Sequence, residues 1–258
     1  MKVVLFCGGQ GMRLRGYNNQ IPKPMMMVGY RPILWYLMKY YAYFGHKDFI
    51  LLLGYKADVI KDYFVNYHEY ISNDFVLSKG GKKLSMINTD ISDWTITFLD
   101  TGINANVGDR LLLAKEHLKS EEMFFANYAD GLTDLPLNIM LNQFKASKCT
   151  GIFMACQPNL TFHFAYFNEK NQLEGIHPAA ETGLFINAGY FIFRNTIFDY
   201  LKKGEELVEE PFKRMIKDRK LMAYKYNGFW RGVDTFKDKH EIDDLYKADK
   251  APWKVWNN

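Results

Sequence analysis

The sequence predicts an α/β fold built around a mainly parallel sheet. Two observations support this prediction: short, wholly apolar runs recur along the chain, and a glycine-containing turn and a helical pattern follow the first two of them. A continuous apolar run of four to eight residues is typical of a strand that is buried on both faces. Strand, turn and helix in repeated order is the arrangement of a parallel sheet with crossover helices.

The first apolar run, Val3 to Cys7, ends at a glycine-rich turn over residues 8–11. Glycines let a backbone turn sharply and approach a ligand closely, and successive N–H groups in such a turn can point at a phosphate. Arg13 adds a guanidinium, and Lys23 adds an ammonium on a segment that two prolines stiffen. These features favour a phosphate site, although a glycine-rich turn also occurs for purely structural reasons.

Two well-known phosphate motifs do not fit this turn. The dinucleotide fingerprint G-x-G-x-x-G would need a glycine where the chain has Leu14, and the pattern G-x-x-x-x-G-K-[ST] of a P-loop does not occur here. The additional Arg13 and the Pro22-Lys23-Pro24 segment therefore indicate a different kind of phosphate site.

The next elements repeat the order of strand, turn and helix. A helix is predicted from Pro32 to about Phe44, with Gly45 as its C-terminal cap. A second apolar strand, Phe49 to Leu53, precedes a helix over about residues 58–67. The polar stretch 72–92 is predicted to leave the sheet, and we expect a solvated loop there rather than a charged lid over a nucleotide.

The later elements are predicted from the same signals. The predicted strands are Trp94 to Leu99, Met123 to Asn127, Cys149 to Cys156, Ile186 to Phe193 and Leu221 to Tyr226. The predicted helices are Gly108 to His117, a short one that Asn195 caps and Gly204 ends, Pro211 to about Arg219, and Thr235 to Lys247.

Composition restricts the class of protein. With 258 residues, of which 48% are hydrophobic, the chain is long and apolar enough for a large core. Its net charge of +4 is small and its lysines are dispersed, which argues against a nucleic acid as partner. An odd count of cysteines, Cys7, Cys149 and Cys156, predicts reduced thiols in a cytoplasmic protein. No apolar run is long enough to span a membrane.

A carboxylate follows the predicted strand Met123 to Asn127, in the pair Asp130-Gly131. Ligands of an open parallel sheet bind beyond the carboxyl ends of its strands. An Asp-Gly pair is more often a simple turn, but the strand before it and the upstream glycine turn favour Asp130 as a metal ligand.

The segment Gly-Gly-x-Gly-x-Arg-Leu at 8–14, followed by Pro-Lys-Pro-Met at 22–25, resembles the signature of the sugar-phosphate nucleotidyltransferases. The resemblance is closest to the glucose-1-phosphate cytidylyltransferases and extends over the whole chain. Phe-Trp-x-x-x-Asp-Thr at 229–235 and the tail at 251–256 support it. The chain departs from the pattern at Met12, where the family usually has a threonine.

The resemblance implies a Rossmann-like fold with a mixed, mainly parallel central sheet flanked by helices. It implies one domain over residues 1–258, with a nucleotide-binding half of about 1–130 and an acceptor-binding half of about 131–258. Arg13 and Lys23 would be catalytic, and Asp130 and Asp234 would hold Mg²⁺. The implied nucleotide-binding residues are Gly8, Gly9, Gln10, Gly11, Met12, Thr101, Gly108 and Arg110.

The implied reaction joins CTP to a phosphorylated small-molecule acceptor and releases pyrophosphate. The attacking phosphate oxygen is already ionised at neutral pH, so positioning and electrostatics supply the catalysis. The product would be a CDP-activated precursor for surface polysaccharide, made in the cytoplasm. We expect a homo-oligomer, because the family commonly forms oligomers, and neither nucleic acid nor membrane as a partner.

The acceptor half departs from the family pattern. Sugar-1-phosphate members carry a Glu-Lys-Pro motif before the strand that contains Asn187, but residues 175–183 include no lysine. The upstream Arg-Phe-Gly is replaced by Thr-Phe-His at 161–163. His163, His177 and Asn187 are the implied acceptor-binding residues, although both histidines can equally be ordinary loop residues.

Three interpretations of this half remain open. The acceptor is a sugar-1-phosphate such as glucose-1-phosphate, with His163 or His177 in place of the lysine; or it is a non-sugar phosphate such as phosphorylated L-glutamine; or the chain is a non-catalytic nucleotide-binding protein. The missing lysine slightly favours the second interpretation. The presence of Lys23, Asp130 and Asp234 argues against the third.

Overall fold

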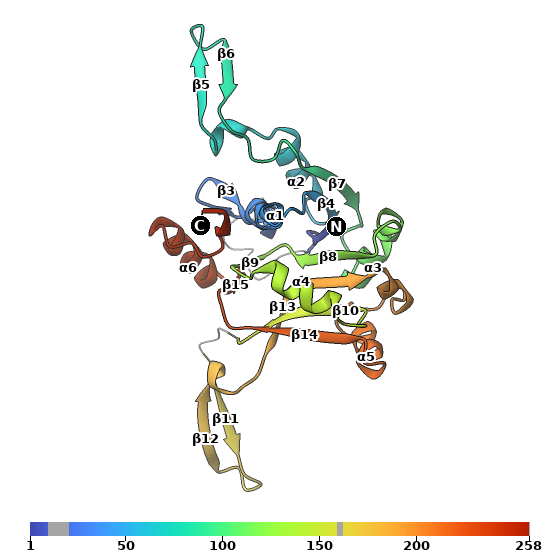
Figure 1. The fold of residues 1–258 in the computed structure, drawn as a ribbon. Helices are drawn as coiled ribbons and strands as arrows, with labels where there is room; N and C mark the ends of the chain where they lie inside the picture. The colour runs from blue at the N-terminus through green and yellow to red at the C-terminus, as the bar shows by residue number, and fades with distance from the viewer. Residues whose placement is uncertain (10–20, 159–161, 258) are drawn as a thin grey trace.

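The computed structural model describes residues 1–9, 21–158 and 162–257. Within these ranges a seven-stranded sheet forms the centre of the molecule, in the order β14-β10-β13-β8-β1-β4-β7 (Figure 1). Its strands are β1 (Val3–Phe6), β4 (Asp48–Leu53), β7 (Thr95–Asp100), β8 (Met123–Tyr128), β10 (Gly151–Cys156), β13 (Ile186–Arg194) and β14 (Leu221–Tyr226).

The directions of the strands confirm a mixed, mainly parallel sheet. Strand β1 pairs in parallel with β4 and β8, β4 pairs in parallel with β7, and β10 pairs in parallel with β14. Only β13 among these strands is reversed, because it runs antiparallel to both β8 and β10. The order β7-β4-β1-β8 of the N-terminal half is that of a Rossmann-like sheet.

Strand β1 lies in the middle of this half and is buried on both faces. Val3 and Leu5 belong to one hydrophobic cluster, whereas Val4 and Phe6 belong to a second cluster. Alternate residues of a strand point to opposite faces, so a strand covered on both sides must be apolar throughout. This is the physical reason why the continuous apolar run predicts β1 correctly.

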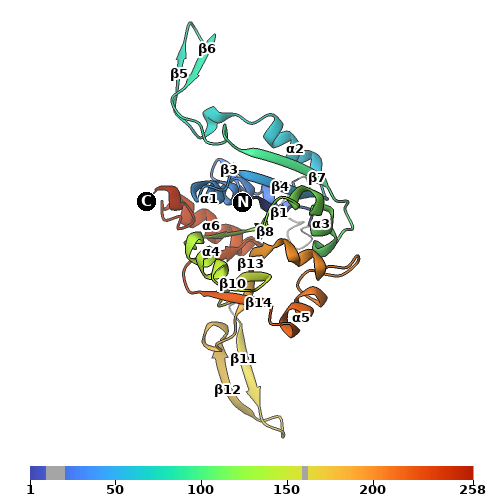
Figure 2. The same cartoon turned by 45° about the vertical axis from the view of Figure 1, so that its right-hand side comes forward.

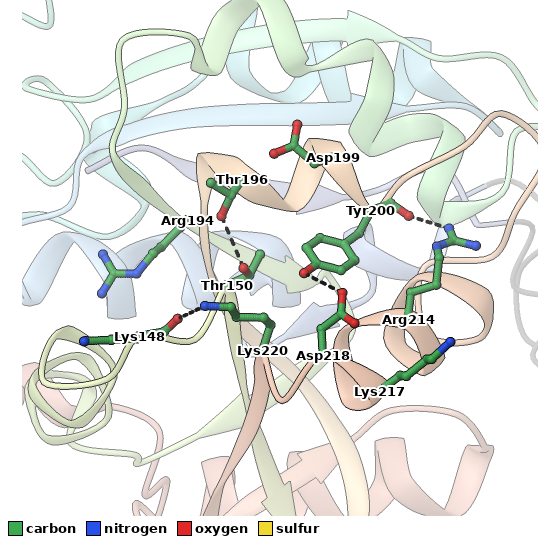
Figure 3. Close-up of a pocket in the computed structure, with 10 residues that line it drawn as sticks. All are labelled: Lys148, Thr150, Arg194, Thr196, Asp199, Tyr200, Arg214, Lys217, Asp218 and Lys220. Carbon is green, nitrogen blue, oxygen red and sulfur yellow. Dashed lines mark hydrogen bonds between the residues drawn. The ribbon is translucent and has the colours of Figure 1, made fainter.

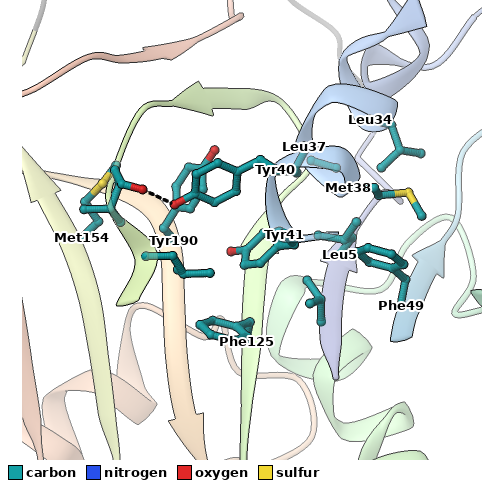
Figure 4. Close-up of a cluster of buried hydrophobic side chains, with 14 of the residues drawn as sticks. Leu5, Leu34, Leu37, Met38, Tyr40, Tyr41, Phe49, Phe125, Met154 and Tyr190 are labelled. Carbon is teal, nitrogen blue, oxygen red and sulfur yellow. Dashed lines mark hydrogen bonds between the residues drawn. The ribbon is translucent and has the colours of Figure 1, made fainter. Parts of the chain in front are cut away.

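The first face is covered by α1 (Ile33–Tyr43), α2 (Ala57–Val65) and α4 (Leu137–Lys145). Figure 4 shows side chains of α1 lying against residues of β1, β4 and β8. Helix α1 begins after Pro32 and ends before Gly45, whose φ of +85° suits glycine, as predicted. Helix α4 lies outside the sequence predictions.

The second face is covered by α3 (Val107–Leu113), α5 (Glu210–Lys217) and two short 3₁₀ helices, Lys115–Leu118 and Asn195–Asp199. The prediction that Asn195 caps a helix is wrong. Its side-chain amide donates instead to the carbonyls of Leu118 and Glu121, at 2.7 and 3.1 Å. Asn195 thereby ties the end of β13 to the loop before β8.

Helix α6 (Phe236–Lys247) packs beside α1 at one end of the sheet. Its first turn is closed by a capping box, in which the Thr235 side chain accepts from the Asp238 N–H and Asp238 accepts from the Thr235 N–H. Beyond α6, the fully buried Trp253 joins the tail to the same apolar cluster. The helix predicted from Thr235 to Lys247 is therefore confirmed.

Two β-ribbons project from opposite ends of the body (Figures 1 and 2). One consists of β5 (Phe75–Ser78) and β6 (Lys83–Met86), the other of β11 (His163–Phe167) and β12 (Leu173–Pro178). The first ribbon confirms that residues 72–92 leave the sheet. Its hairpin was not predicted, because strands with both faces largely exposed need no regular apolar alternation.

Two further strand pairs lie near the sheet: β2 (Met27–Val28) with β3 (Arg31–Pro32), and β9 (Gly131–Thr133) with β15 (Trp230–Gly232). All three cysteines are free, and burial raises the pKa of Cys156 to about 11. In the parts of the chain that the structure describes, every helix is too short or too polar to cross a membrane.

His46 gives the fold a testable pH dependence. Its ring packs on Phe125 at 4.6 Å, and burial lowers its pKa to about 4, helped by the amino terminus and Lys145. An unfolded histidine titrates near 6.5, so the unfolded chain binds more protons as the pH falls from about 6.5 to about 4. The free energy of unfolding should therefore fall by about 1–2 kcal/mol between roughly pH 7.5 and pH 5 through this residue alone.

Urea denaturation of the wild type and of His46→Gln at both pH values measures this contribution. The variant should lose less stability on acidification than the wild type. Equal losses in the two proteins would contradict the assignment.

Candidate active site

A hollow of about 120 Å³ lies at the carboxyl ends of β1 and β8, where an open sheet is expected to bind its ligands. Five predicted site residues line it: Gly8, Gly9, Lys23, Arg110 and Asp130. They come from three separate regions of the sequence and meet only in the folded chain. The other lining residues are Phe6, Pro24, Val107, Tyr128 and Ala129.

Lys23 is held at this hollow by a 3₁₀ turn, Lys23–Met25, that follows Pro22. Its ammonium donates to Asp130 Oδ2 and to Asp234 Oδ1, each at 2.6 Å. One cation therefore joins two carboxylates that are far apart in sequence.

The two carboxylates are brought together by the β9–β15 ladder. Gly131 pairs with Gly232 in this ladder, and the N–H of Val233 donates to the carbonyl of Asp130 at 2.9 Å. The ladder thus fixes the backbone of Asp130 beside the residue that precedes Asp234. This contact connects the two halves of the chain at the site.

The charge of Lys23 is set by these neighbours. Burial alone would lower the pKa of its ammonium, but Asp130 and Asp234 outweigh that effect and raise the pKa above its ordinary value. Only 12% of the Lys23 side chain is exposed, against 34% for Asp130 and 54% for Asp234. The lysine is therefore a buried, permanent cation whose two partners remain open to ligands.

Asp130 and Asp234 fit a magnesium ion by their chemistry. Mg²⁺ prefers oxygen ligands and is commonly bound by one or two carboxylates together with substrate phosphates and water. The two carboxylates already share one cation, the Lys23 ammonium, so they are close enough to act on the same charge. Among the described residues, no cluster of three or more His, Cys, Asp or Glu side chains is placed to hold a metal ion.

Arg110 lies beneath the glycine turn and is 4% exposed. Its Nη1 donates to the carbonyl of Leu53 at 3.0 Å and to the hydroxyl of Thr101, and its Nη2 donates to the carbonyl of Gly8 at 3.1 Å. Leu53 ends β4, and Gly8 and Thr101 follow β1 and β7 closely. One guanidinium therefore fixes the ends of three parallel strands.

The two glycines at the start of the turn have different surroundings. A Cβ on Gly8 would lie 2.0 Å from Arg110 Nη1, whereas a Cβ on Gly9 would meet none of the described residues within 4 Å. Gly8 is thus required by the close approach of the arginine, a reason that the sequence interpretation missed. Gly9 lines the hollow and is not crowded by any part of the chain that the structure describes.

Thr101 and Gly108 are packed into the supports of the site. The Thr101 hydroxyl donates to the Leu53 carbonyl at 2.6 Å, and a Cβ on Gly108 would lie 2.2 Å from the Glu205 carbonyl. Neither residue is among those that line the hollow. Their contact with a nucleotide stays a prediction.

Four predicted residues, Gln10, Gly11, Met12 and Arg13, lie outside the described residues. Their assignment to the nucleotide and to catalysis stays a prediction.

The predicted acceptor residues are placed in two different regions. Asn187 lies at the start of β13, near Tyr128, which lines the hollow, and its Oδ1 accepts from the N–H of Gly189 at 2.9 Å. His163 and His177 lie on the β11–β12 ribbon, where both are exposed and neither lines the hollow. Of the three, the chain brings only Asn187 beside the hollow, and the acceptor role of all three stays a prediction.

Tyr128 is a residue that the sequence analysis missed. Its ring occupies the space left by Gly189, which has a φ of +78° and on which a Cβ would lie 2.6 Å from Tyr128 Cδ2. Burial raises the pKa of Tyr128, so its hydroxyl stays protonated and available as a donor. The available sequence signal was its position two residues before Asp130.

The chain belongs to the nucleotidyl transferase family, whose model matches residues 2–249. It is 38% identical over 266 residues to a Bacillus subtilis (strain 168) protein named probable glucose-1-phosphate cytidylyltransferase, covering 99% of this chain and 100% of the relative. It is 34% identical over 258 residues to the glucose-1-phosphate cytidylyltransferase of Salmonella typhi, with 99% and 100% covered. The protein is thus a nucleotidyltransferase.

Solved structures share the fold. A UDP-glucose pyrophosphorylase complexed with UDP-glucose superposes with a TM-score of 0.70 at 16% identity, covering 96% of this chain and 98% of that one. HddC from Yersinia pseudotuberculosis superposes with a TM-score of 0.67 at 18% identity, with 95% and 99% covered. The Rossmann-like nucleotidyltransferase fold predicted from the sequence is therefore confirmed.

The different surroundings of the two glycines predict different costs for adding one methyl group. Gly8→Ala should lower the free energy of unfolding by about 1–3 kcal/mol, because the Cβ displaces the Arg110 guanidinium from a packed position. Gly9→Ala is the matched control and should leave stability within about 0.5 kcal/mol of the wild type. Urea denaturation measures both, and equal stability of the two variants would refute the role given to Gly8.

Proposed function

We propose that the protein is a magnesium-dependent cytidylyltransferase that transfers CMP from CTP to a phosphate monoester and releases pyrophosphate. The observation that carries the proposal is the Lys23 ammonium between the carboxylates of Asp130 and Asp234, beside the turn that begins at Gly8. The full-length similarity to proteins named as cytidylyltransferases supports CTP as the nucleotide.

In this reaction an oxygen of the acceptor phosphate attacks the α-phosphorus of CTP. A new P–O bond forms, the bond between the α-phosphorus and its bridging oxygen breaks, and pyrophosphate leaves with the bond electrons. No protein nucleophile is needed, and the acceptor phosphate is already ionised. The obstacle is the repulsion between two polyanions, so the protein must supply fixed positive charge.

Lys23 meets that need because it is a buried cation that the two carboxylates keep charged. When bound, Mg²⁺ on Asp130 and Asp234 would offset phosphate charge as a Lewis acid. Arg110 acts indirectly, because its donors are used in holding the backbone of the turn. Arg13 and the N–H groups of residues 8–11 would hold the β- and γ-phosphates.

We propose a non-sugar phosphate, such as phosphorylated L-glutamine, as the acceptor. Residues 175–183 supply no lysine to grip a sugar phosphate, and His163 and His177 lie on an exposed ribbon. Asn187 and Tyr128 remain as polar groups beside the hollow on the acceptor side. The product would be a CDP-activated precursor for capsule or lipopolysaccharide synthesis.

A second candidate acceptor is glucose-1-phosphate, which would give CDP-glucose. It is favoured by the two relatives named for that substrate, which align over 99% of this chain at 38% and 34% identity. Both candidates use the same nucleotide and the same chemistry at Lys23, Asp130 and Asp234. They differ only in what the acceptor pocket must recognise.

Removal of the central charges should abolish turnover without unfolding the protein. Asp130→Asn or Lys23→Ala should lower kcat/KM by at least about 100-fold, because each removes a charge that acts on the reacting phosphates. Pyrophosphate release from CTP measures the loss, and Lys82→Ala on the β5–β6 ribbon is the control for lysine removal at a distance. Near-normal turnover in either site variant would remove this mechanism.

A panel of acceptors distinguishes the two candidates. With CTP and magnesium, we expect pyrophosphate release with phosphorylated L-glutamine to exceed that with glucose-1-phosphate by at least about tenfold in kcat/KM, since a pocket without the sugar-phosphate lysine loses one charge-assisted hydrogen bond. The opposite preference would make the protein a glucose-1-phosphate cytidylyltransferase. If no nucleotide and acceptor pair gives pyrophosphate release, the result would favour the non-catalytic interpretation.

A further inference from the structure

A second hollow, of about 670 Å³, lies away from the candidate active site (Figure 3). It is formed where β13 ends and β14 begins, with α5 on one side. Its lining residues are Lys148, Thr150, Arg194, Thr196, Asp199, Tyr200, Arg214, Lys217, Asp218 and Lys220. None of these residues lines the hollow around Lys23.

The two hollows lie at opposite ends of the strands of the central sheet. Arg194 pairs with Met123, the first residue of β8, whereas Asp130 follows Tyr128, the last residue of the same strand. Five residue steps along a strand span about 17 Å. The second hollow is therefore a separate site and not an extension of the first.

The lining carries an excess of positive charge, with five basic side chains against two carboxylates. Two of the basic groups are already paired: Arg194 with Glu122 at 3.0 Å, and Arg214 with Glu205. Lys148, Lys217 and Lys220 have no carboxylate within 4.0 Å among the described residues. The excess positive charge thus resides on the ammonium groups of these three lysines.

The neutral and acidic groups of the lining are held in place by hydrogen bonds. The hydroxyls of Thr150 and Thr196 lie 3.2 Å apart, and the Tyr200 hydroxyl donates to Asp218 at 3.1 Å. The ammonium of Lys220 donates to the Lys148 carbonyl at 3.1 Å, the bond drawn as a dashed line in Figure 3. The result is a built polar surface with cationic donors, hydroxyls and two carboxylates that can accept from ligand hydroxyls.

This combination selects a chemical class of ligand. Ammonium groups and hydroxyls suit a phosphate, whereas carboxylates suit the hydroxyl groups of a sugar or ribose. The volume falls in the range of sites that hold small molecules. A nucleotide or a sugar phosphate presents both kinds of group within that space.

We propose that this hollow is a second ligand site, outside the active site, for a small phosphate-bearing metabolite with hydroxyl groups. Its ligand can be the nucleotide substrate or a CDP-linked product, which share this chemistry. The choice of these two ligands rests on the proposed function, whereas the loss of binding in a variant of this hollow is measured separately from activity.

Isothermal titration with magnesium and without acceptor tests the proposal, with CTP, CDP-glucose and inorganic pyrophosphate as separate probes. The pocket variant is Lys217→Gln/Lys220→Gln, and the matched control Lys82→Gln/Lys83→Gln removes two lysine charges from the β5–β6 ribbon. We expect the wild type and the control to bind CTP or CDP-glucose at two sites per chain. The pocket variant should bind the second equivalent at least about tenfold more weakly, because it loses charge-assisted hydrogen bonds.

The probe that the pocket variant binds more weakly than the wild type does identifies the source of the ligand. If the pocket variant binds only pyrophosphate more weakly, the hollow is a phosphate site that does not recognise hydroxyl groups. That result would overturn the class of ligand assigned here. Equal binding in all three proteins, or equal weakening in the pocket and control variants, would overturn the site itself. If Lys220→Gln destabilises the fold, the exposed pair Lys148→Gln/Lys217→Gln carries the same test.

Discussion

The active-site end of the sheet depends on one buried guanidinium. Arg110 reaches from α3 to the carbonyls of Leu53, at the end of β4, and Gly8, after β1, and to the hydroxyl of Thr101, after β7, so that these buried acceptors are paired without water. This arrangement requires that Gly8 and Gly54 have no Cβ, since each would lie within 3 Å of the arginine. Gly8 is thereby held in place against the arginine, and fixed positions are what a reaction driven by positioning requires.

A second constraint is the balance of charge at Lys23. Two carboxylates without a cation would repel one another, and a buried ammonium without carboxylates would lose its charge. The β9–β15 ladder brings Asp130 and Asp234 to the same ammonium and satisfies both requirements. Because the two carboxylates are far more exposed than the lysine, incoming ligands meet them first, while the lysine keeps a fixed charge behind them.

Because β13 runs antiparallel to its neighbours, its first and last residues lie at opposite ends of the strands of the central sheet. Its first residues, including Asn187 and Gly189, lie beside Tyr128 at the candidate active site, and its last residue, Arg194, lines the second hollow. The positively charged second hollow thus shares β13 with the candidate active site. The exposed β11–β12 ribbon joins β10 to β13 and removes residues 163–178 from the body of the sheet.

The sequence by itself determined the parallel core and made Lys23 and Asp130 candidates, because buried strands, prolines beside a lysine and a carboxylate beyond a strand end leave local patterns, whereas Asp234 was indicated by the resemblance to the family. Only the tertiary structure decided that Lys23 bridges the two carboxylates, since these contacts span 107 and 211 residues. It also decided that Arg110 supports backbone carbonyls and that Asn195 bonds across to another loop. The side-chain types of these residues permit several partners, and the partner that each one has depends on which distant segments the fold brings within reach.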